Sequence, residues 1–145
     1  MVLGFMYAET NPLMTEEAYP YTSGEGKSGA CMYEASEGVG KVGGFEEVDK
    51  SVDQMKAAIM KGPVSVAIEA DKSVFQHYRS GVLSGGACGT KLDHGVLAVG
   101  YGSEDGEDYF LVKNSWGSSW GDEGYIKIGQ DNVCGILQDA SYPTE

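Results

Sequence analysis

The stretch Lys91–Gly121, KLDHGVLAVGYGSEDGEDYFLVKNSWGSSWG, decides the interpretation of the whole chain. It holds His94, one of only two histidines, and an Asn-Ser-Trp-Gly run that begins twenty residues later at Asn114 (114 − 94 = 20). Two segments of strand character are joined by an acidic, glycine-containing connection, which predicts a β-hairpin. These are the strands Val96–Tyr101 and Tyr109–Val112 and the loop Ser103–Asp108. Such a hairpin brings His94 and Asn114 to the same end, where their side chains can touch.

A histidine held by an amide oxygen has a chemical use. A base near neutral pH needs one ring nitrogen free and the other anchored, so that tautomer and ring orientation are fixed. Asn114 can accept a hydrogen bond from His94 without adding negative charge, and Trp116 and Trp120 can cover that bond. The alternative is a structural hairpin with a satisfied core histidine. The two motifs Leu-Asp-His-Gly and Lys-Asn-Ser-Trp-Gly-x-x-Trp-Gly occur together and in order, which favours catalysis.

Several motifs together resemble the C-terminal catalytic half of papain-like cysteine proteases, closest to the cathepsin L type. The central ones are Asp93-His94-Gly95, Gly100-Tyr101-Gly102, and Lys113–Gly117 followed by Trp120-Gly121. Others are Glu16–Tyr21, Gly62–Val66, Cys88-Gly89, Gly124-Tyr125, Cys134–Ile136 and Ser141–Pro143. The resemblance covers essentially the whole chain.

The resemblance implies an α+β, papain-like fold. Residues 1–42 would be a remnant of the left, helical domain with its loop, and residues 43–145 the right, antiparallel β-barrel-like domain. His94 would be the general base, the partner of a thiolate and then the general acid. Asn114 would orient His94, and Trp116 with Trp120 would support the pair as a hydrophobic shield.

The nucleophile of the family is not among these residues. That cysteine lies in a Cys-Gly-Ser-Cys-Trp type segment about 130 residues before the histidine, which falls ahead of residue 1. The resemblance matches Cys88 and Cys134 to a disulfide, with buried free thiols as the alternative, and leaves Cys31 without its upstream partner. We therefore expect the His/Asn-bearing C-terminal portion of a cysteine endopeptidase, inactive alone and completed by a missing N-terminal segment. The alternative is a non-catalytic papain-fold binding protein that has lost the nucleophile segment.

The resemblance also implies a pocket, called S2, for the substrate side chain two residues before the scissile bond. Its lining residues would be Ala67, Leu92, Gly95 and, at its floor, Asp139. The first three are small or apolar and suit Leu, Val or Phe. An ionised Asp139 would also pair with Arg or Lys, unless its side chain turns outward to solvent.

Composition and family limit the partners. The net charge of −12 argues against a nucleic-acid-binding protein, which needs basic patches. The expected partners are a peptide or protein substrate and a propeptide or cystatin-type inhibitor, with no cofactor and no metal. The sequence has no transmembrane run and no signal peptide, and the resemblance implies a lysosomal, vacuolar or secreted protein.

Periodicity predicts the remaining elements. An apolar helix is expected from Met1 to Asn11, where Pro12 stops it. Ser51 and Gln54 form a capping box that begins a helix ending at Lys61. A strand is expected at Val64–Ile68, a short helical turn with a surface His77 at Ser73–Arg79, and a last strand at Gly124–Ile128.

Overall fold

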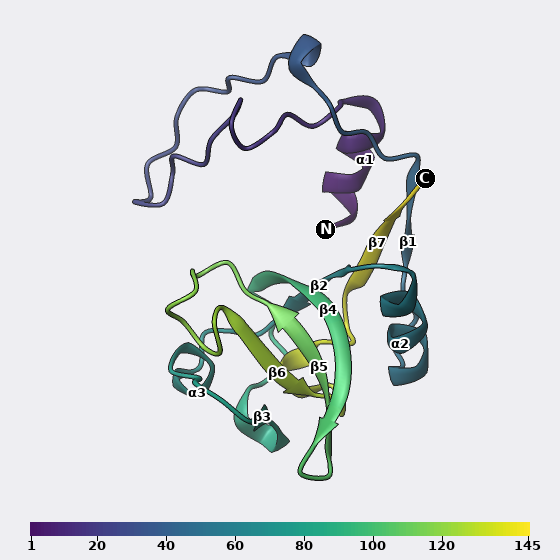
Figure 1. Cartoon of the computed structure of the whole chain (residues 1–145), viewed down its shortest axis with the longest axis vertical. Coiled ribbons are helices and arrows are strands. Elements are labelled where there is room, and N and C mark those ends of the chain that lie inside the picture. Colours follow the sequence, from purple (N-terminus) through teal and green to yellow (C-terminus); the bar gives the residue numbers. More distant parts are fainter. The chain divides into compact units, whose positions relative to one another are not determined.

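The computed structural model describes the backbone of residues 1–145 and every side chain except that of Ala87. The chain forms two compact units. The larger unit contains Glu46–Tyr142 and Met1, and the smaller unit contains Val2–Phe45 and Pro143–Glu145. Figure 1 traces the chain from helix α1 in the smaller unit to the sheet and helix α2 of the larger unit.

A seven-stranded sheet dominates the fold, with strand order β1-β7-β2-β4-β5-β6-β3. The pairs β2–β4, β2–β7, β4–β5 and β5–β6 are antiparallel, and β3–β6 is parallel. The strands are β1 Gly44–Glu47, β2 Val64–Ile68, β3 Val82–Leu83, β4 His94–Glu104, β5 Glu107–Lys113, β6 Tyr125–Gly129 and β7 Ala140–Thr144. With its helices, this sheet confirms the predicted α+β class.

The predicted hairpin is present as β4 and β5, but its loop is shorter than predicted. Ser103 pairs with Asp108 and Glu104 pairs with Glu107, so only Asp105 and Gly106 form the turn. Both turn residues have positive φ, 52° and 85°. An Asp-Gly pair tolerates this conformation and matches the twist of the flanking strands. The acidic residues assigned to the loop therefore continue the ladder.

The core of the larger unit follows from strand alternation. In β2, Val64, Val66 and Ile68 are fully buried while the residues between them are half-buried. Successive side chains of a strand point to opposite faces, so this strand turns every second residue into the core. The other fully buried large side chains are Met55, Phe75, Phe110, Val112, Ile126, Ile128 and Ile136.

Helix α2, Val52–Lys61, has one half of the predicted capping box, because the Ser51 N–H donates to the Asp49 carbonyl at 2.7 Å and not to the Gln54 side chain. The Ser51 hydroxyl accepts a hydrogen bond from the Gln54 backbone N–H at 3.2 Å. Met55 and Ala58 on its inner face are buried. Helix α3, Ser73–Gln76, is shorter than the predicted turn, and His77 directly after it is exposed, as predicted. Three 3-10 turns complete the fold: η1 Ala35–Glu37, η2 Gly85–Ala87 and η3 Val133–Gly135.

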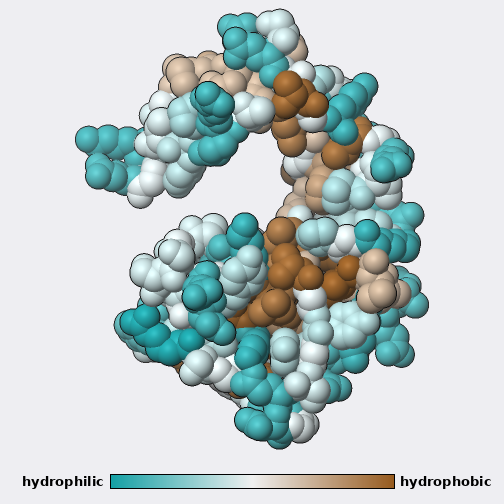
Figure 2. All heavy atoms as spheres, viewed as in Figure 1, coloured by the Kyte–Doolittle hydropathy of each residue, from teal (hydrophilic) through white to brown (hydrophobic). Residues whose placement is uncertain are grey.

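The smaller unit has little buried surface. Helix α1, Val2–Thr10, ends just before Asn11-Pro12, as predicted, and buries only Ala8. Leu3 is 80% exposed and Met6 52% exposed, while Phe5 stacks on Phe45 with ring centroids 6.1 Å apart. Figure 2 shows hydrophobic residues (brown) on the surface of both units. Among the described residues, no helix has the length and apolar character needed to cross a membrane.

Candidate functional site

The two ends of the hairpin bring His94 and Asn114 together. His94 is the first residue of β4, where it pairs with Ile68 of β2. Asn114 directly follows β5, and its backbone N–H donates to the Gly124 carbonyl at 3.0 Å. The His94 Nε2 and Asn114 Oδ1 atoms lie 2.8 Å apart. The predicted contact is therefore a hydrogen bond of ordinary length.

The neighbouring backbone determines the direction of this hydrogen bond. The Ser115 N–H donates to the same Asn114 oxygen at 2.8 Å. An amide nitrogen in that position would oppose the Ser115 donor, so the atom facing His94 is the oxygen, which only accepts. The Nε2 of His94 must then carry the proton. In the neutral ring the other nitrogen, Nδ1, keeps its lone pair and can act as a base.

Trp116 covers the imidazole. Its ring stacks on that of His94 with centroids 5.1 Å apart and an interplanar angle of 29°. Trp116 is itself 40% exposed, whereas Asn114 is only 8% exposed. Trp120 packs edge-on against Trp116 at 5.3 Å, and its indole N–H donates to the Gln76 carbonyl at 3.0 Å. Trp116 therefore shields the histidine directly, and Trp120 supports Trp116.

Phe75 of α3 completes the aromatic cluster, and the sequence analysis missed it. This fully buried ring lies 5.5 Å from Trp116, 5.2 Å from Trp120 and 6.4 Å from His94, measured between centroids. The available signal was an apolar spacing, because Tyr78 follows three residues later and is also buried. The spacing of Phe75 and Tyr78 is that of the buried face of a helical turn.

The residues predicted for S2 are only partly brought together. Ala67 and Gly95 are directly paired across β2 and β4, and the Ala67 N–H donates to the Asp139 carbonyl at 2.9 Å. Leu92 lies over Gly135, where an added Cβ would come within 2.7 Å of the Leu92 Cδ2 atom. Asp139 is half-buried. Its orientation toward a substrate stays a prediction.

The cysteines follow the pairing that the resemblance implies. Cys88 and Cys134 are joined by a disulfide with Cα atoms 4.7 Å apart, and both residues are buried. Cys31 is a free, exposed cysteine. The alternative of two buried free thiols is therefore wrong.

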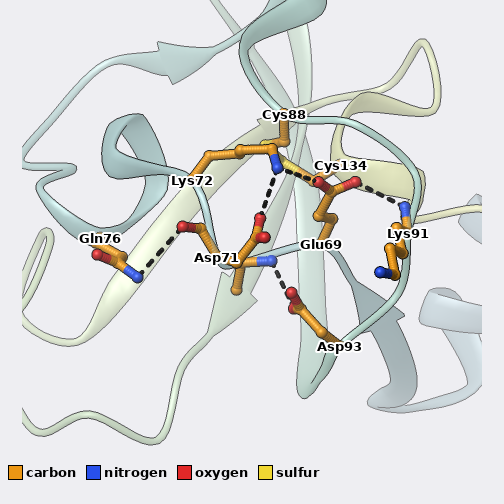
Figure 3. A network of polar contacts seen from close by, with 9 residues as sticks. Glu69, Asp71, Lys72, Gln76, Cys88, Lys91, Asp93 and Cys134 are labelled. Carbon is orange, nitrogen blue, oxygen red and sulfur yellow. Dashed lines mark hydrogen bonds and ion pairs between the residues drawn. A yellow bond between two sulfur atoms is a disulfide. The ribbon is translucent and has the colours of Figure 1, made fainter.

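Figure 3 shows a polar network before His94 that sequence reasoning also missed. The Asp93 carboxylate accepts the Ala70 N–H at 2.8 Å, and the Asp93 N–H donates to the Ile68 carbonyl at 2.9 Å. Nearby, Glu69 is buried beside Lys72 and Lys91. Hydrogen bonds from the Lys72 ammonium and the Lys91 backbone hold the pKa of the Glu69 carboxyl below its usual range, and Glu69 raises the pKa of Lys72.

The described part of the chain contains no cluster of side chains that could bind a metal ion. There, no three side chains of His, Cys, Asp or Glu come close enough to hold an ion.

Both the sequence and the fold are similar to known proteases. Residues 1–144 match the family model described as papain family cysteine protease. Germination-specific cysteine protease 1 of Arabidopsis thaliana is 47% identical, over 92% of this chain and 36% of its own length. Digestive cysteine proteinase 3 of Homarus americanus is 47% identical, over 99% of this chain and 46% of its own length. The chain thus spans less than half of these relatives.

A solved structure gives the same result for the fold. Digestive procathepsin L2 proteinase from Tenebrio molitor larval midgut superposes with a TM-score of 0.91 at 39% identity. The match covers 100% of this chain and 47% of that one. The predicted papain-like fold is confirmed.

Proposed function

Because the chain belongs to the papain family of cysteine proteases, in its cathepsin L-like branch, we propose that it carries the base of a cysteine endopeptidase and the amide that orients this base. Residues 1–42 would be the remnant of the left domain and residues 43–145 the right domain. The nucleophile would come from a segment outside these residues. The observation that carries the proposal is the His94–Asn114 hydrogen bond, in which the Ser115 N–H also donates to the Asn114 oxygen and so fixes its orientation.

The geometry supports a specific sequence of proton transfers. The Nδ1 lone pair of His94 takes the proton of the thiol, and the imidazolium pairs with the thiolate. The thiolate sulfur attacks the peptide carbonyl carbon, and Nδ1–H then gives its proton to the leaving amine, so that a thioester forms. Water hydrolyses the thioester with Nδ1 again as base. Throughout, Nε2–H stays bonded to Asn114, which fixes the ring.

We further propose that the 145-residue chain does not hydrolyse peptides by itself. Cys88 and Cys134 are joined in the disulfide, and among the described residues no thiol forms a hydrogen bond with His94. Without a thiolate no acyl intermediate can form. The purified chain should give no turnover of a dipeptidyl fluorogenic substrate. Turnover that disappears in a His94→Ala variant would contradict this.

The division of roles is tested in the protease completed with the nucleophile segment. His94→Ala should lower kcat/KM at least about 10³-fold, whereas Asn114→Ala should lower it only about 10- to 100-fold, because Asn114 orients the base but transfers no proton. His77→Ala is the matched control, because His77 is exposed and lies outside the site. Equal losses for His94 and Asn114 would refute the division.

A thiol-directed activity probe decides between enzyme and binding protein. Labelling of the completed protein, lost on alkylation of the nucleophile, supports the protease. A completed protein that the probe never labels, but that still binds peptides, would make this a non-catalytic member of the fold.

Substrate preference is proposed to depend on Asp139. The Ala67–Asp139 backbone hydrogen bond keeps Asp139 beside the strand that carries Ala67. If the Asp139 carboxylate faces the substrate, the protease should accept Arg as well as Leu two residues before the scissile bond. Asp139→Ala should lower the Arg-to-Leu ratio of kcat/KM about tenfold.

The control for this experiment is the exposed Asp131, whose replacement by Ala should leave the ratio unchanged. An unchanged ratio in Asp139→Ala would mean that Asp139 turns to solvent and does not contact the substrate.

Partners and location are proposed from the same family. The Tenebrio neighbour is a procathepsin, which supports inhibition of the completed protease by a propeptide. A cystatin-type inhibitor is the second proposed partner, and the proposed location is a lysosome, vacuole or secretory fluid. Co-fractionation of the protein with an acid-compartment marker, or its recovery from the medium, tests the location. A protein confined to the cytosol would contradict it.

A further inference from the structure

Glu69 is a buried carboxylate that the mechanism above does not use. It directly follows β2 and is 4% exposed. One carboxylate oxygen accepts the Lys91 backbone N–H at 2.6 Å, and the other lies 2.8 Å from the Lys72 ammonium (Figure 3). Lys72 also pairs with Asp71 at 3.0 Å. Both direct partners of Glu69 are donors, so an acceptor-only group suits this position.

Glu69 joins three segments that are distant in the sequence. Its backbone N–H donates to the carbonyl of Cys134, a residue of η3, at 2.8 Å. Its carboxylate lies directly against Gly89, where any added Cβ would clash with the Glu69 Oε2 atom. Gly89 follows Cys88, which is bonded to Cys134. The carboxylate therefore sits where the end of β2, the 88–93 segment and η3 meet.

These contacts fix the backbone on both sides of Leu92. On one side, Glu69 holds the Lys91 N–H. On the other, Asp93 is held by the Ile68 carbonyl and the Ala70 N–H. Leu92 is half-buried over Gly135, so its position depends on both anchors. His94, by contrast, has its own restraints through Asn114 and Trp116.

We propose that Glu69 is a positioning residue for substrate binding. Its carboxylate, with Lys72 as counter-ion, holds the Lys91 backbone and thereby fixes the position of Leu92 in the wall of the substrate pocket. This rests on the proposed function, which gives Leu92 its contact with substrate. Glu69 acts on binding and not on proton transfer, because the restraints on His94 do not pass through it.

The test compares steady-state kinetics of variants of the completed protease on a substrate with Leu two residues before the scissile bond. Glu69→Gln removes the negative charge, so the Lys72 ion pair is lost and the Lys91 N–H can keep at best a hydrogen bond to an uncharged amide oxygen. The Lys91 anchor therefore weakens. We expect KM to rise about three- to tenfold while kcat stays within about twofold. The double variant Glu69→Leu/Lys72→Met removes the buried charge together with its partner and should raise KM similarly. It keeps the test informative if Glu69→Gln folds poorly.

Two controls bracket the effect. Lys72→Arg alone keeps a cation beside Glu69 and should leave KM nearly unchanged. Glu104→Gln removes a different carboxylate, paired with Lys127 at the far end of β4 from His94, and should leave KM unchanged.

Amide exchange gives a readout independent of activity. In Glu69→Gln, the Lys91 amide should exchange about tenfold faster, whereas the Asp93 amide, bonded to Ile68, should not change. Unchanged KM, or a loss confined to kcat, would overturn the proposal. An inactive completed wild type would overturn the proposed function and with it the substrate role of Leu92. Faster Lys91 exchange would then still show that Glu69 holds this backbone.

Discussion

The two units of this chain differ most in what they bury. The larger unit encloses a continuous core formed by β2, β5, β6, α2 and Phe75, whereas the smaller unit buries Ala8 alone among its described side chains. Burial of apolar surface is the main favourable term in folding. The stability of the chain should therefore reside in the larger unit.

Every contact found for His94 comes from that same unit. Ile68, Phe75, Asn114 and Trp116 all belong to it. The larger unit alone therefore supplies the side chains that orient the His94 ring. Under the proposed function, the nucleophile would come from a segment outside residues 1–145. Four measurements test how far the two units differ in stability.

Hydrogen exchange should show the largest contrast. Amides in the interior of β4 and β5 are paired on a buried sheet, whereas residues 20–34 form mostly open loop. We expect the strand amides to exchange at least about 10⁴-fold more slowly. Mass spectrometry of peptic fragments measures this. Similar rates in the two regions would show that the larger unit is not independently stable.

Matched phenylalanine substitutions come next. Phe110→Ala empties a fully buried site in the larger unit and should cost about 3–5 kcal/mol. Phe5→Ala removes a half-buried ring in the smaller unit and should cost about 1 kcal/mol or less. Urea unfolding followed by tryptophan fluorescence reports the larger unit, which contains Trp116 and Trp120. Equal shifts of the midpoint would contradict the comparison.

The cysteines give a similar contrast. The Cys88–Cys134 bond closes a loop of 46 residues, and removing it should cost about 4 kcal/mol in the chain-entropy model. Cys31→Ser changes an exposed residue and should cost less than about 0.5 kcal/mol. Peptide mapping without reductant should recover the Cys88–Cys134 link. A link from Cys31 to either of them would refute this pairing.

Helix capping should give the smallest effect. Ser51→Ala removes the cap of α2 and should cost about 1 kcal/mol. Its counterpart is Thr15, whose hydroxyl accepts the Ala18 N–H at 3.2 Å on an exposed turn of the smaller unit. Thr15→Ala should leave the fluorescence midpoint unchanged. A larger loss from Thr15 than from Ser51 would place stability in the smaller unit.

Local chemistry made much of this structure predictable. Pro12 predicts the end of α1, which lies two residues earlier at Thr10. Ser51 predicts the start of α2, and the alternation of apolar residues predicts β2. The predicted loop, Ser103–Asp108, was too long. Acidic residues favour exposed positions, but an exposed strand end meets that preference as well as a loop does, so composition alone could not tell the two apart. Only the backbone conformation of Asp105 and Gly106 distinguished the two.

The sequence by itself determined the family, the hairpin and the approach of His94 to Asn114, because residue type and spacing along one hairpin fix which ends meet. Only the tertiary structure decided that Phe75 lies behind Trp116 and that Glu69 is buried against Lys91. Those partners come from separate segments, so their contact depends on strand register and packing. Periodicity tells which face of an element is buried, but not which side chain from another segment it meets there.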